Sequence, residues 1–327
     1  MPASIGSRHF VRWLGIGVLG SAIVSAALVV LGDGPEVVRA LAGYDVTVLL
    51  EMLALAAVGF VVRAVRWGAL MRVAGHPMPL RDSLYLQIAG QAMTVTPGRV
   101  GEIMKPWLAR EISGMRMTSG VTLVFAERVA DLIAVCVLAL GGVAALGGRT
   151  WVLLAGTVVV AAGTAIAGSG WFHGLALRVV RRRGPDSTLE TSAQTIADTL
   201  ARSLHWRVLA WSVPASLVAW GLEGIGFTLC IEEFGFDGLG VLAGVSIYAV
   251  ATIAGAFSFL PGGIGLTEAS MVGILVAVGM PVTGASGATL VTRVATLWWG
   301  VALGWGALGS RLALLKRFPG AEAGSAV

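Results

Sequence analysis

The sequence predicts an all-α polytopic membrane protein, with about six to eight spanning helices and two Pro-Gly broken, re-entrant hairpins in an inverted repeat. The chain has 327 residues, of which 56% are hydrophobic and 13% charged. Its mean hydropathy of +0.85 is not that of a soluble domain. Apolar runs reach the roughly 20 residues that cross a bilayer. Short motifs also occur twice in one order, and these three observations define the fold class.

Apolar runs long enough to span the membrane predict the individual helices. They are residues 13–31, 46–62, 121–146, 151–167, 208–231 and 288–308. Two further apolar pairs, residues 84–108 and 241–280, flank Pro-Gly motifs. The first pair is too short to cross twice, so we interpret it as a re-entrant hairpin. The second is compatible with either a hairpin or two spans.

The repeat consists of four landmarks that recur about 164 residues apart. The first copy has Ser-Leu-Tyr at 83–85, Ile-Ala-Gly at 88–90, Pro-Gly-Arg-Val-Gly at 97–101 and Arg-Val-Ala at 128–130. The second has Ser-Ile-Tyr at 246–248, Ile-Ala-Gly at 253–255, Pro-Gly-Gly-Ile-Gly at 261–265 and Arg-Val-Ala at 293–295. Each motif is common in a chain with 46 glycines, but their shared order indicates a duplicated unit.

Basic residues predict the topology. With a cytoplasmic N-terminus, most of the 23 Lys and Arg residues fall on the cytoplasmic side, and Arg39 and Arg149 fall outside. This bias explains the pI near 9.9 without nucleic-acid binding. We expect a multi-pass protein of the cytoplasmic (inner or plasma) membrane with both termini in the cytoplasm. The first hairpin then enters from the cytoplasm and the second from outside, so the copies are inverted.

Four segments follow along the chain. They are a first membrane half (1–170), a cytoplasmic amphipathic linker (171–207), a second membrane half (208–317) and a disordered tail (318–327). The linker has apolar residues at helical spacing, which predicts a helix on the cytoplasmic surface that joins the halves. These residues are Leu189, Ala193, Ile196, Leu200 and Leu204. A regulatory or partner-docking helix is the alternative.

Catalytic signatures are missing from the sequence. It has no G-x-S-x-G, Walker loop, complete G-x-G-x-x-G or D-x-D pair. Cys136 and Cys230 lie in apolar runs without CxxC spacing, and the four histidines match no metal-ligand spacing. We therefore expect no enzyme active site, no cofactor and no metal.

Charged residues inside apolar runs are the main candidates for a site. Glu127 and Asp131 are one helical turn apart and would repel each other unless cations or protons neutralise them. Glu223 sits in the middle of another apolar run. The candidate counter-charges are Arg99, Arg128 and Arg293. Ionisable groups in hydrocarbon cost several kcal/mol, so they face a polar cavity or each other.

Two structural alternatives remain open for these charges. Glu127, Arg128 and Asp131 are also compatible with an ion-pair cluster that only joins helices. Arg63 and Arg66 lie on one helix face, and their long side chains are more simply read as reaching to the cytoplasmic interface.

The Pro-Gly turns suggest anion binding. Pro97 and Pro261 each end a half-helix, and the next one begins near Glu102 or Glu268 with its positive end toward the turn. Such an end binds phosphate, and Arg99 adds a positive charge at the first turn. The glycines of the second turn are Gly262, Gly263 and Gly265. The alternative is that these glycines only allow close packing.

Three motifs together carry a family resemblance. They are Pro97-Gly98-Arg99-Val100-Gly101-Glu102, then Glu127-Arg128 with Asp131, and Leu260-Pro261-Gly262-Gly263-Ile264-Gly265 with Glu268. Over roughly residues 10–315 the chain resembles the flippase-like transmembrane region of the lysylphosphatidylglycerol synthase family. The resemblance implies movement of a phospholipid or polyprenyl-linked lipid between leaflets. Because no aminoacyl-transferase domain follows residue 327, the chain resembles a stand-alone member, and lysyl transfer is not expected.

The expected function is transport of an anionic phospholipid or polyprenyl-linked lipid, with membrane lipid as the partner. The phosphate would contact Arg99, Arg128 and Arg293. Amine or hydroxyl groups would contact Glu127, Asp131, Glu223 and Glu268, or these carboxyls would exchange protons. Glu102, Gly262, Gly263 and Gly265 would complete the substrate site at the helix ends. The alternative is a polyprenyl-phosphate-dependent glycosyltransferase.

Overall fold

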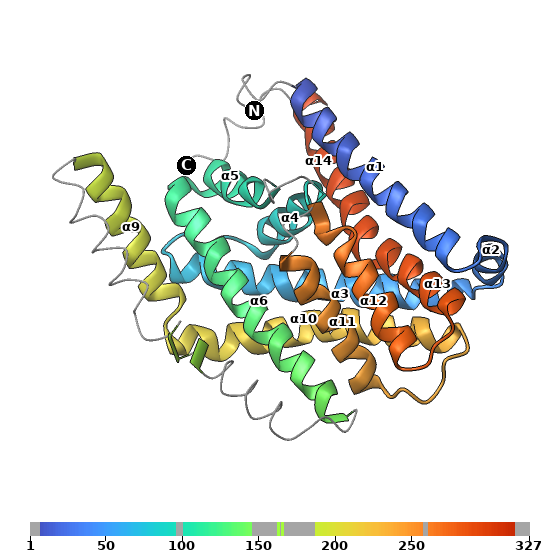
Figure 1. The fold of residues 1–327 in the computed structure, drawn as a ribbon. Coiled ribbons are helices and arrows are strands. Elements are labelled where there is room, and N and C mark those ends of the chain that lie inside the picture. The colour runs from blue at the N-terminus through green and yellow to red at the C-terminus, as the bar shows by residue number, and fades with distance from the viewer. Residues whose placement is uncertain are drawn as a thin grey trace.

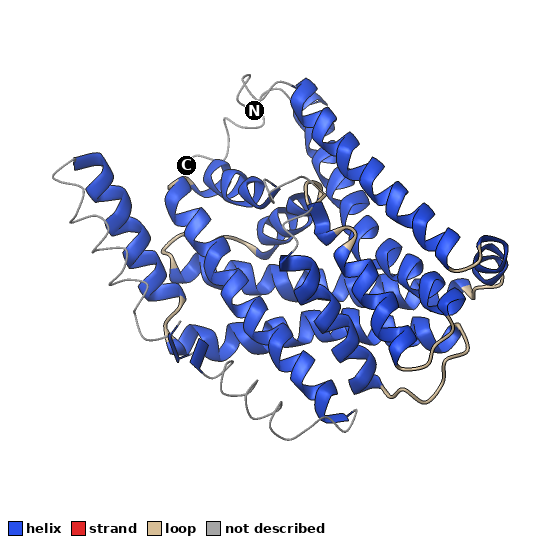
Figure 2. Ribbon diagram, in the orientation of Figure 1, coloured by secondary structure: helices blue, strands red, loops and turns tan. Residues whose placement is uncertain are grey.

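The computed structural model describes residues 7–95, 101–145, 162–163, 165–166, 187–257 and 261–317. Within these ranges the chain is helical and has no strand (Figure 2), so the all-α prediction is confirmed. The elements, labelled in Figure 1, are α1 (Ser7–Leu31), α2 (Gly34–Ala42), α3 (Val46–Val73), α4 (Leu80–Gln91), α5 (Gly101–Ser113), α6 (Met117–Ala145), α9 (Ser187–Ser203), α10 (Trp206–Glu233), α11 (Val241–Phe257), the 3₁₀ turn η2 (Pro261–Gly263), α12 (Leu266–Ala277), α13 (Val282–Arg293), the π-helical turn η3 (Val294–Trp298) and α14 (Trp299–Arg317). The first Pro-Gly turn, the tail and nearly all of the span expected at 151–167 lie outside the described residues.

Two described helices have the length and composition of a membrane span, α3 and α10. Each has 28 residues, which at about 1.5 Å per residue is more than enough to cross a bilayer core of about 30 Å. A third span is possible if α1 and α2, which meet at a bend of 103°, count as one. Helix α6 has 29 residues, but three charges lie near its middle. The expected number of six to eight spans stays a prediction.

Helix α3 begins at a side-chain cap. The carboxylate of Asp45 accepts a hydrogen bond of 2.8 Å from the backbone N–H of Thr47, which satisfies one of the free donors at the helix start. This hydrogen bond lowers the pKa of the exposed Asp45 carboxyl. The span therefore starts directly after Asp45, as the apolar run at 46–62 predicts. It continues to Val73, past Arg63 and Arg66, which end the apolar run and are buried.

The equivalent helices α3 and α10 pack against each other and run antiparallel. Met52 of α3 lies against Gly226, whereas Arg66, further along α3, contacts Ser216, which is earlier on α10. Gly59 allows this close approach, since a Cβ there would lie 3.4 Å from the carbonyl oxygen of Ala219. Two equivalent spans with opposite direction are what an inverted repeat requires.

The remaining helices exchange partners between the two repeated units. Helix α6 of the first unit packs on α11 of the second, and α14 of the second packs on α4 of the first. Within each unit the hairpin helices contact each other, α4 with α5 and α11 with α12. Such reciprocal contacts are those of two copies related by a two-fold axis. The central region of Figure 1 therefore contains elements from both halves of the chain.

The second Pro-Gly segment forms a hairpin. Helix α12 has 12 residues, about 18 Å at 1.5 Å per residue, and is too short to cross the membrane by itself. Gly262, Gly263 and Gly265 have φ values of 59°, 68° and 93°, which are favourable only for glycine. A Cβ on Gly263 would also lie 2.6 Å from the hydroxyl of Thr267. These glycines therefore allow both the turn and the close packing of the hairpin, and anion binding at the turn stays a prediction.

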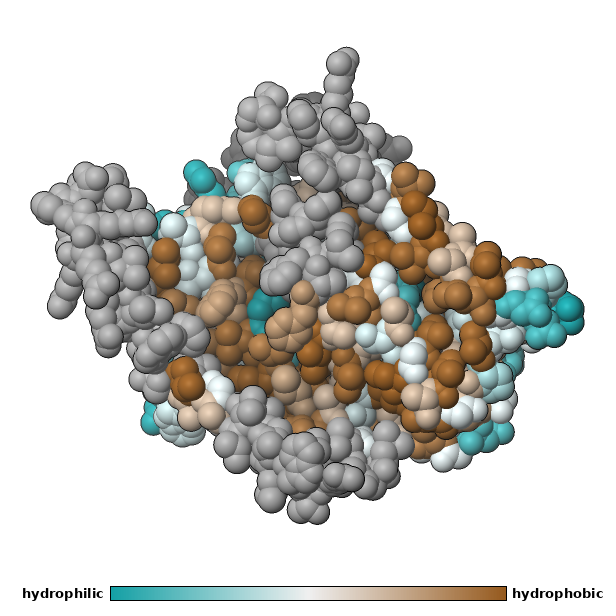
Figure 3. All heavy atoms as spheres, viewed as in Figure 1, coloured by the Kyte–Doolittle hydropathy of each residue, from teal (hydrophilic) through white to brown (hydrophobic). Residues whose placement is uncertain are grey.

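The surface is strongly apolar over the described face in Figure 3, where hydrophobic side chains cover most of the helical body. Among the exposed apolar residues are Leu19, Ile23, Val46, Leu50 and Val65. An apolar surface of this extent is the mark of a protein that contacts lipid. Hydrophilic side chains gather at the α2 end and in a small area near the middle of the same face.

The predicted amphipathic helix is observed as α9, and its apolar side contacts protein. Leu200 of α9, and Leu204 directly after its end, are buried with Ala126 of α6 and Leu209 of α10. The prediction of a helix at this place is confirmed. Its position on the cytoplasmic surface stays a prediction, and residues 171–186 lie outside the described ranges.

Candidate functional site

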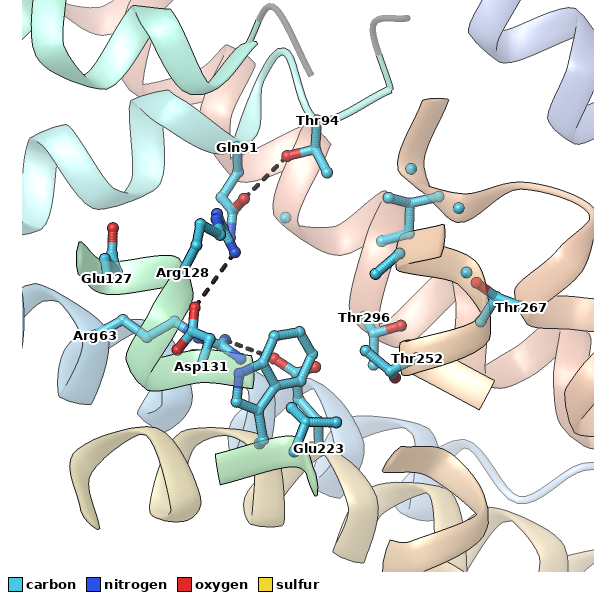
Figure 4. Close-up of a pocket in the computed structure, with 18 of the residues that line it drawn as sticks. Arg63, Gln91, Thr94, Glu127, Arg128, Asp131, Glu223, Thr252, Thr267 and Thr296 are labelled. Atoms are coloured by element: carbon cyan, nitrogen blue, oxygen red, sulfur yellow. Dashed lines mark hydrogen bonds and ion pairs between the residues drawn. The ribbon is translucent and has the colours of Figure 1, made fainter. Parts of the chain in front are cut away.

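A cavity of about 500 Å³ lies where the two repeated units meet. Its walls come from α3, α4, α5 and α6 of the first unit and from α10, α11, η2, α12, α13, η3 and α14 of the second. Figure 4 shows charged side chains on one side, including Arg63, Arg128 and Asp131. Thr252, Thr267 and Thr296 lie on the opposite side, so the two walls differ in chemistry.

The first charged group centres on Glu127 and Asp131 of α6. Arg66 of α3 contacts both carboxylates, Glu127 at 2.8 Å and Asp131 at 2.6 Å. Lys105 of α5 reaches Glu127 at 2.7 Å and lies 3.9 Å from the centre of the Trp67 ring. The repulsion expected between two carboxylates one turn apart is thus neutralised by cations of two other helices.

The second charged group joins the two long helices. The guanidinium of Arg63 lies 2.6 Å from Glu223 and 4.6 Å from the centre of the Trp220 ring. The Tyr248 hydroxyl of α11 donates a hydrogen bond of 2.5 Å to the other oxygen of Glu223. Arg63 and Glu223 are each the eighteenth residue of their 28-residue helices. They therefore hold the same place in their helices, and they contact each other across the repeat.

The burial of Arg63 and Arg66 of α3 decides whether these side chains extend to the cytoplasmic interface or pair inside the protein. Arg63 is 7% exposed and Arg66 is 2% exposed, so neither side chain extends to an interface with water. Each guanidinium forms an ion pair with a carboxylate of another helix, because a buried charge needs a partner of opposite charge. The interpretation of Arg63 and Arg66 as interface-reaching side chains is wrong.

A third charged group holds the second Pro-Gly turn. Arg293 lies 2.6 Å from Glu268 and donates a hydrogen bond of 2.7 Å to the carbonyl oxygen of Gly262. Glu268 also accepts a hydrogen bond of 2.7 Å from the N–H of Gly265 at the start of α12. The anionic group at this helix end is therefore a side chain of the protein itself.

Arg128 has a different environment from its repeat equivalent Arg293. Its guanidinium is 3.3 Å from Asp131, and 42% of its side chain is exposed, against 13% for Arg293. At the fixed repeat offset of about 164 residues, the position of Glu268 corresponds to Met104 in the first unit. Met104 packs in an apolar cluster. Arg128 lines the cavity and is more exposed than Arg293, which holds the second Pro-Gly turn.

Most of the predicted site residues are brought together. Those that line the cavity are Glu127, Arg128, Asp131, Glu223, Gly262, Gly263 and Arg293. Gly265 and Glu268 do not line it and lie behind the turn that Arg293 holds. Arg99 is outside the described residues, and Glu102 lies in the first turn of α5, where its side chain is not described. Their substrate roles stay predictions.

Sequence reasoning missed several residues of the cavity. Lys105, Gln87, Tyr248, Thr252 and Thr296 all line it. The one indication in the sequence was Lys105, a lysine within the apolar hairpin at 84–108. Neutral threonines and glutamines do not indicate a site in the sequence, because they are tolerated at many positions of membrane helices.

Fold and site together define a polytopic helical membrane protein with a charged cavity between two inverted units. The family model of the lysylphosphatidylglycerol synthase transmembrane region matches residues 16–304. The chain belongs to this family, as the sequence resemblance predicts.

Two relatives come from Methanothermobacter thermautotrophicus, and both are named UPF0104 membrane protein. One is 26% identical over 314 residues, covering 87% of this chain and 89% of the relative. The other is 24% identical over 318 residues, covering 89% and 93%. Similarity thus extends over nearly the whole of each protein.

Proposed function

We propose that this protein is a flippase-like transporter, which moves an anionic phospholipid or polyprenyl-linked lipid between leaflets through the central cavity. The observation that carries the proposal is a charged cavity between two antiparallel units, inside a body whose surface is apolar. A phosphate headgroup cannot enter hydrocarbon without losing its hydration, which costs many kcal/mol. A polar cavity lowers that barrier while the acyl chains stay in lipid.

Charge balance supports an anionic headgroup. Five buried or half-buried cations lie at the cavity and its adjoining turn, against four carboxylates. The cations are Arg63, Arg66, Lys105, Arg128 and Arg293, and the carboxylates are Glu127, Asp131, Glu223 and Glu268. The described cluster therefore carries one excess positive charge, and Arg128 is its most exposed cation. Arg128 is the proposed phosphate contact.

The inverted repeat supplies the rest of the proposed mechanism. Units that are related by a two-fold axis can exchange conformations, which would open the cavity to one leaflet and then to the other. The protein would lie in the cytoplasmic membrane with both termini in the cytoplasm, as the basic residues predict.

Reconstitution in liposomes tests the function. Lipids labelled on an acyl chain keep their headgroups intact, and a membrane-impermeant quencher reports how fast they leave the outer leaflet. We expect faster movement with protein than without, and a roughly tenfold slower rate for Arg128→Gln, because a charge-assisted hydrogen bond to phosphate is lost. Asp131 keeps Arg66 at 2.6 Å, so this variant should fold. Arg202→Gln on the exposed side of α9 is the matched control.

The lipid panel should include a polyprenyl phosphate as well as phospholipids. If no lipid moves faster than in protein-free liposomes, transport is refuted. Consumption of a nucleotide sugar with polyprenyl phosphate would instead establish the glycosyltransferase alternative.

A further inference from the structure

The cavity walls differ in a way that selects among anionic headgroups. The charged wall comes mainly from α3, α5, α6 and α10, and the opposite wall from α11, η2, α12 and η3. In Figure 4 the three threonines of the second wall face the charged residues across the open space. A headgroup in this space would contact charge on one side. On the other side it would contact threonines and Arg293, whose guanidinium is already paired with Glu268 and the carbonyl oxygen of Gly262.

The carboxylates of the charged wall already have cationic partners among the described residues. Glu127 contacts Arg66 and Lys105, and Asp131 contacts Arg66 at 2.6 Å. Glu223 pairs with Arg63 at 2.6 Å. An ammonium group of a substrate would have to displace one of these cations and leave it buried without a partner, which is unfavourable. The cavity is therefore poorly suited to a cationic amine.

The neutral wall offers complementary hydrogen-bonding groups. Thr252 and Thr296 each donate their hydroxyl proton to a backbone carbonyl four residues earlier, both at 2.8 Å. The oxygens of both hydroxyls remain acceptors beside the cavity. On the side of Arg128 in Figure 4, Gln91 of α4 accepts a hydrogen bond from Thr94 through its amide oxygen, so its amide N–H groups remain donors. A hydroxyl group, which donates and accepts, fits this combination.

We infer that the headgroup is a phosphate that carries a neutral, hydroxylated moiety such as glycerol or a sugar, and not one with a free amine. The phosphate lies at Arg128, and the hydroxyls lie against Thr252 and Thr296. This inference rests on the proposed function, since it assigns the substrate class of the same cavity. It also predicts that an aminoacyl ester, which adds ammonium groups to the headgroup, is excluded.

Four lipids that carry a label on matched acyl chains test the inference in liposomes. They are phosphatidylglycerol, phosphatidic acid, phosphatidylethanolamine and the lysyl ester of phosphatidylglycerol. We expect phosphatidylglycerol to move fastest, and the two amine-bearing lipids to move slowest. Comparable rates for the lysyl ester and phosphatidylglycerol would overturn the inference while leaving transport intact.

Variants separate the two walls. Thr252→Val with Thr296→Val keeps side-chain volume but removes both hydroxyls. We expect it to slow phosphatidylglycerol roughly tenfold, the effect of two neutral hydrogen bonds, and to leave phosphatidic acid unchanged. Thr289→Val is the matched control, because Thr289 makes the same bond to a backbone carbonyl but does not line the cavity. Equal slowing of both lipids would contradict the assignment of the hydroxyls.

Binding distinguishes a failure of the inference from a failure of transport. In native mass spectrometry of the detergent-purified protein with an equimolar lipid mixture, we expect phosphatidylglycerol to be retained over its lysyl ester. Selective retention without movement in liposomes would refute transport and uphold the headgroup class. Equal retention would refute the headgroup class. Displacement of the lipid by soluble glycerol phosphate at equal concentration would identify a water-soluble substrate instead and overturn the inference.

Discussion

Arg66 contacts two carboxylates of α6 and the hydroxyl of Ser216, and it is almost completely buried. Its planar guanidinium has donors for both carboxylates at once, whereas the single ammonium of a lysine does not. Lys105 stabilises only Glu127, at 2.7 Å. Asp131 therefore depends on Arg66 for its shorter ion pair.

We predict that Arg66→Ala destabilises the folded protein by about 3–5 kcal/mol, because it leaves buried carboxylates with too few cations. Arg66→Lys should recover only part of this loss. Thermal unfolding of the purified protein in one detergent measures the effect. Arg81→Ala is the control, since Arg81 is 86% exposed and lies 3.5 Å from its partner Asp82, and exposed pairs contribute about 0–1 kcal/mol. Equal unfolding temperatures for Arg66→Ala and the parent protein would refute the assigned role.

At the scale of elements, the contact between α3 and α10 contains an ion pair between residues that hold the same place in their helices, Arg63 with Glu223. We predict that Arg63→Met alone is strongly destabilising, by about 3–5 kcal/mol, because among the described residues Glu223 keeps only the Tyr248 hydroxyl. Arg63→Met with Glu223→Leu should restore most of the stability, since apolar residues can replace a buried pair. Unfolding temperatures of the single and double variants form the test. Additive losses in the double variant would show that the pair is not coupled.

The contact of α6 with α11 depends on a glycine. A Cβ at Gly142 would overlap Ser246, whose hydroxyl donates a hydrogen bond of 2.6 Å to the carbonyl of Ala139. We predict that Gly142→Ala destabilises by about 1–3 kcal/mol, because the two helices must separate. Gly221→Ala, in a helix and with nothing within 4 Å, should be neutral or slightly stabilising. The two variants are compared by thermal unfolding, and equal effects would contradict the close contact.

Hydropathy predicted where the helices lie far better than it predicted which helices contact each other. The runs at 46–62 and 208–231 identified α3 and α10 because both are apolar along most of their length. The run at 288–308 falls inside α13, η3 and α14, and the π-helical turn after Arg293 was missed because backbone register has no mark in composition. Helix α2 was missed because nine residues are too few for a span.

The sequence predicted most residues of the candidate site, but it predicted only some of the ion pairs between them. Sequence indicated that Glu127 and Asp131 need counter-charges and that an arginine is near, and Arg128 does contact Asp131. The shorter pairs are with Arg66, which is more than 60 residues away along the chain. Such a partner is defined by how helices pack, and periodicity contains no information on it.

At the scale of the whole molecule, the antiparallel contact of α3 with α10 predicts a measurable difference in topology. Both helices begin at a capped, exposed N-terminal end, after Asp45 and after His205. In a protein without Cys136 and Cys230, single cysteines at Val46 and Arg207 should therefore react from opposite sides of the membrane. The positive-inside rule assigns Val46 to the outside and Arg207 to the cytoplasm.

Intact cells treated with a membrane-impermeant thiol reagent should modify Val46→Cys and not Arg207→Cys, and opened cells should modify both. Cysteines at Ser7 and Ala321 should behave like the one at Arg207, because both termini are expected in the cytoplasm. Reaction of Val46→Cys and Arg207→Cys from the same side would exclude an inverted repeat, since equivalent helices would then cross in one direction. The reverse assignment, with Arg207→Cys modified in intact cells, would keep the inversion and overturn only the orientation. The experiment thus separates the architecture, which follows from packing, from the orientation, which follows from charge.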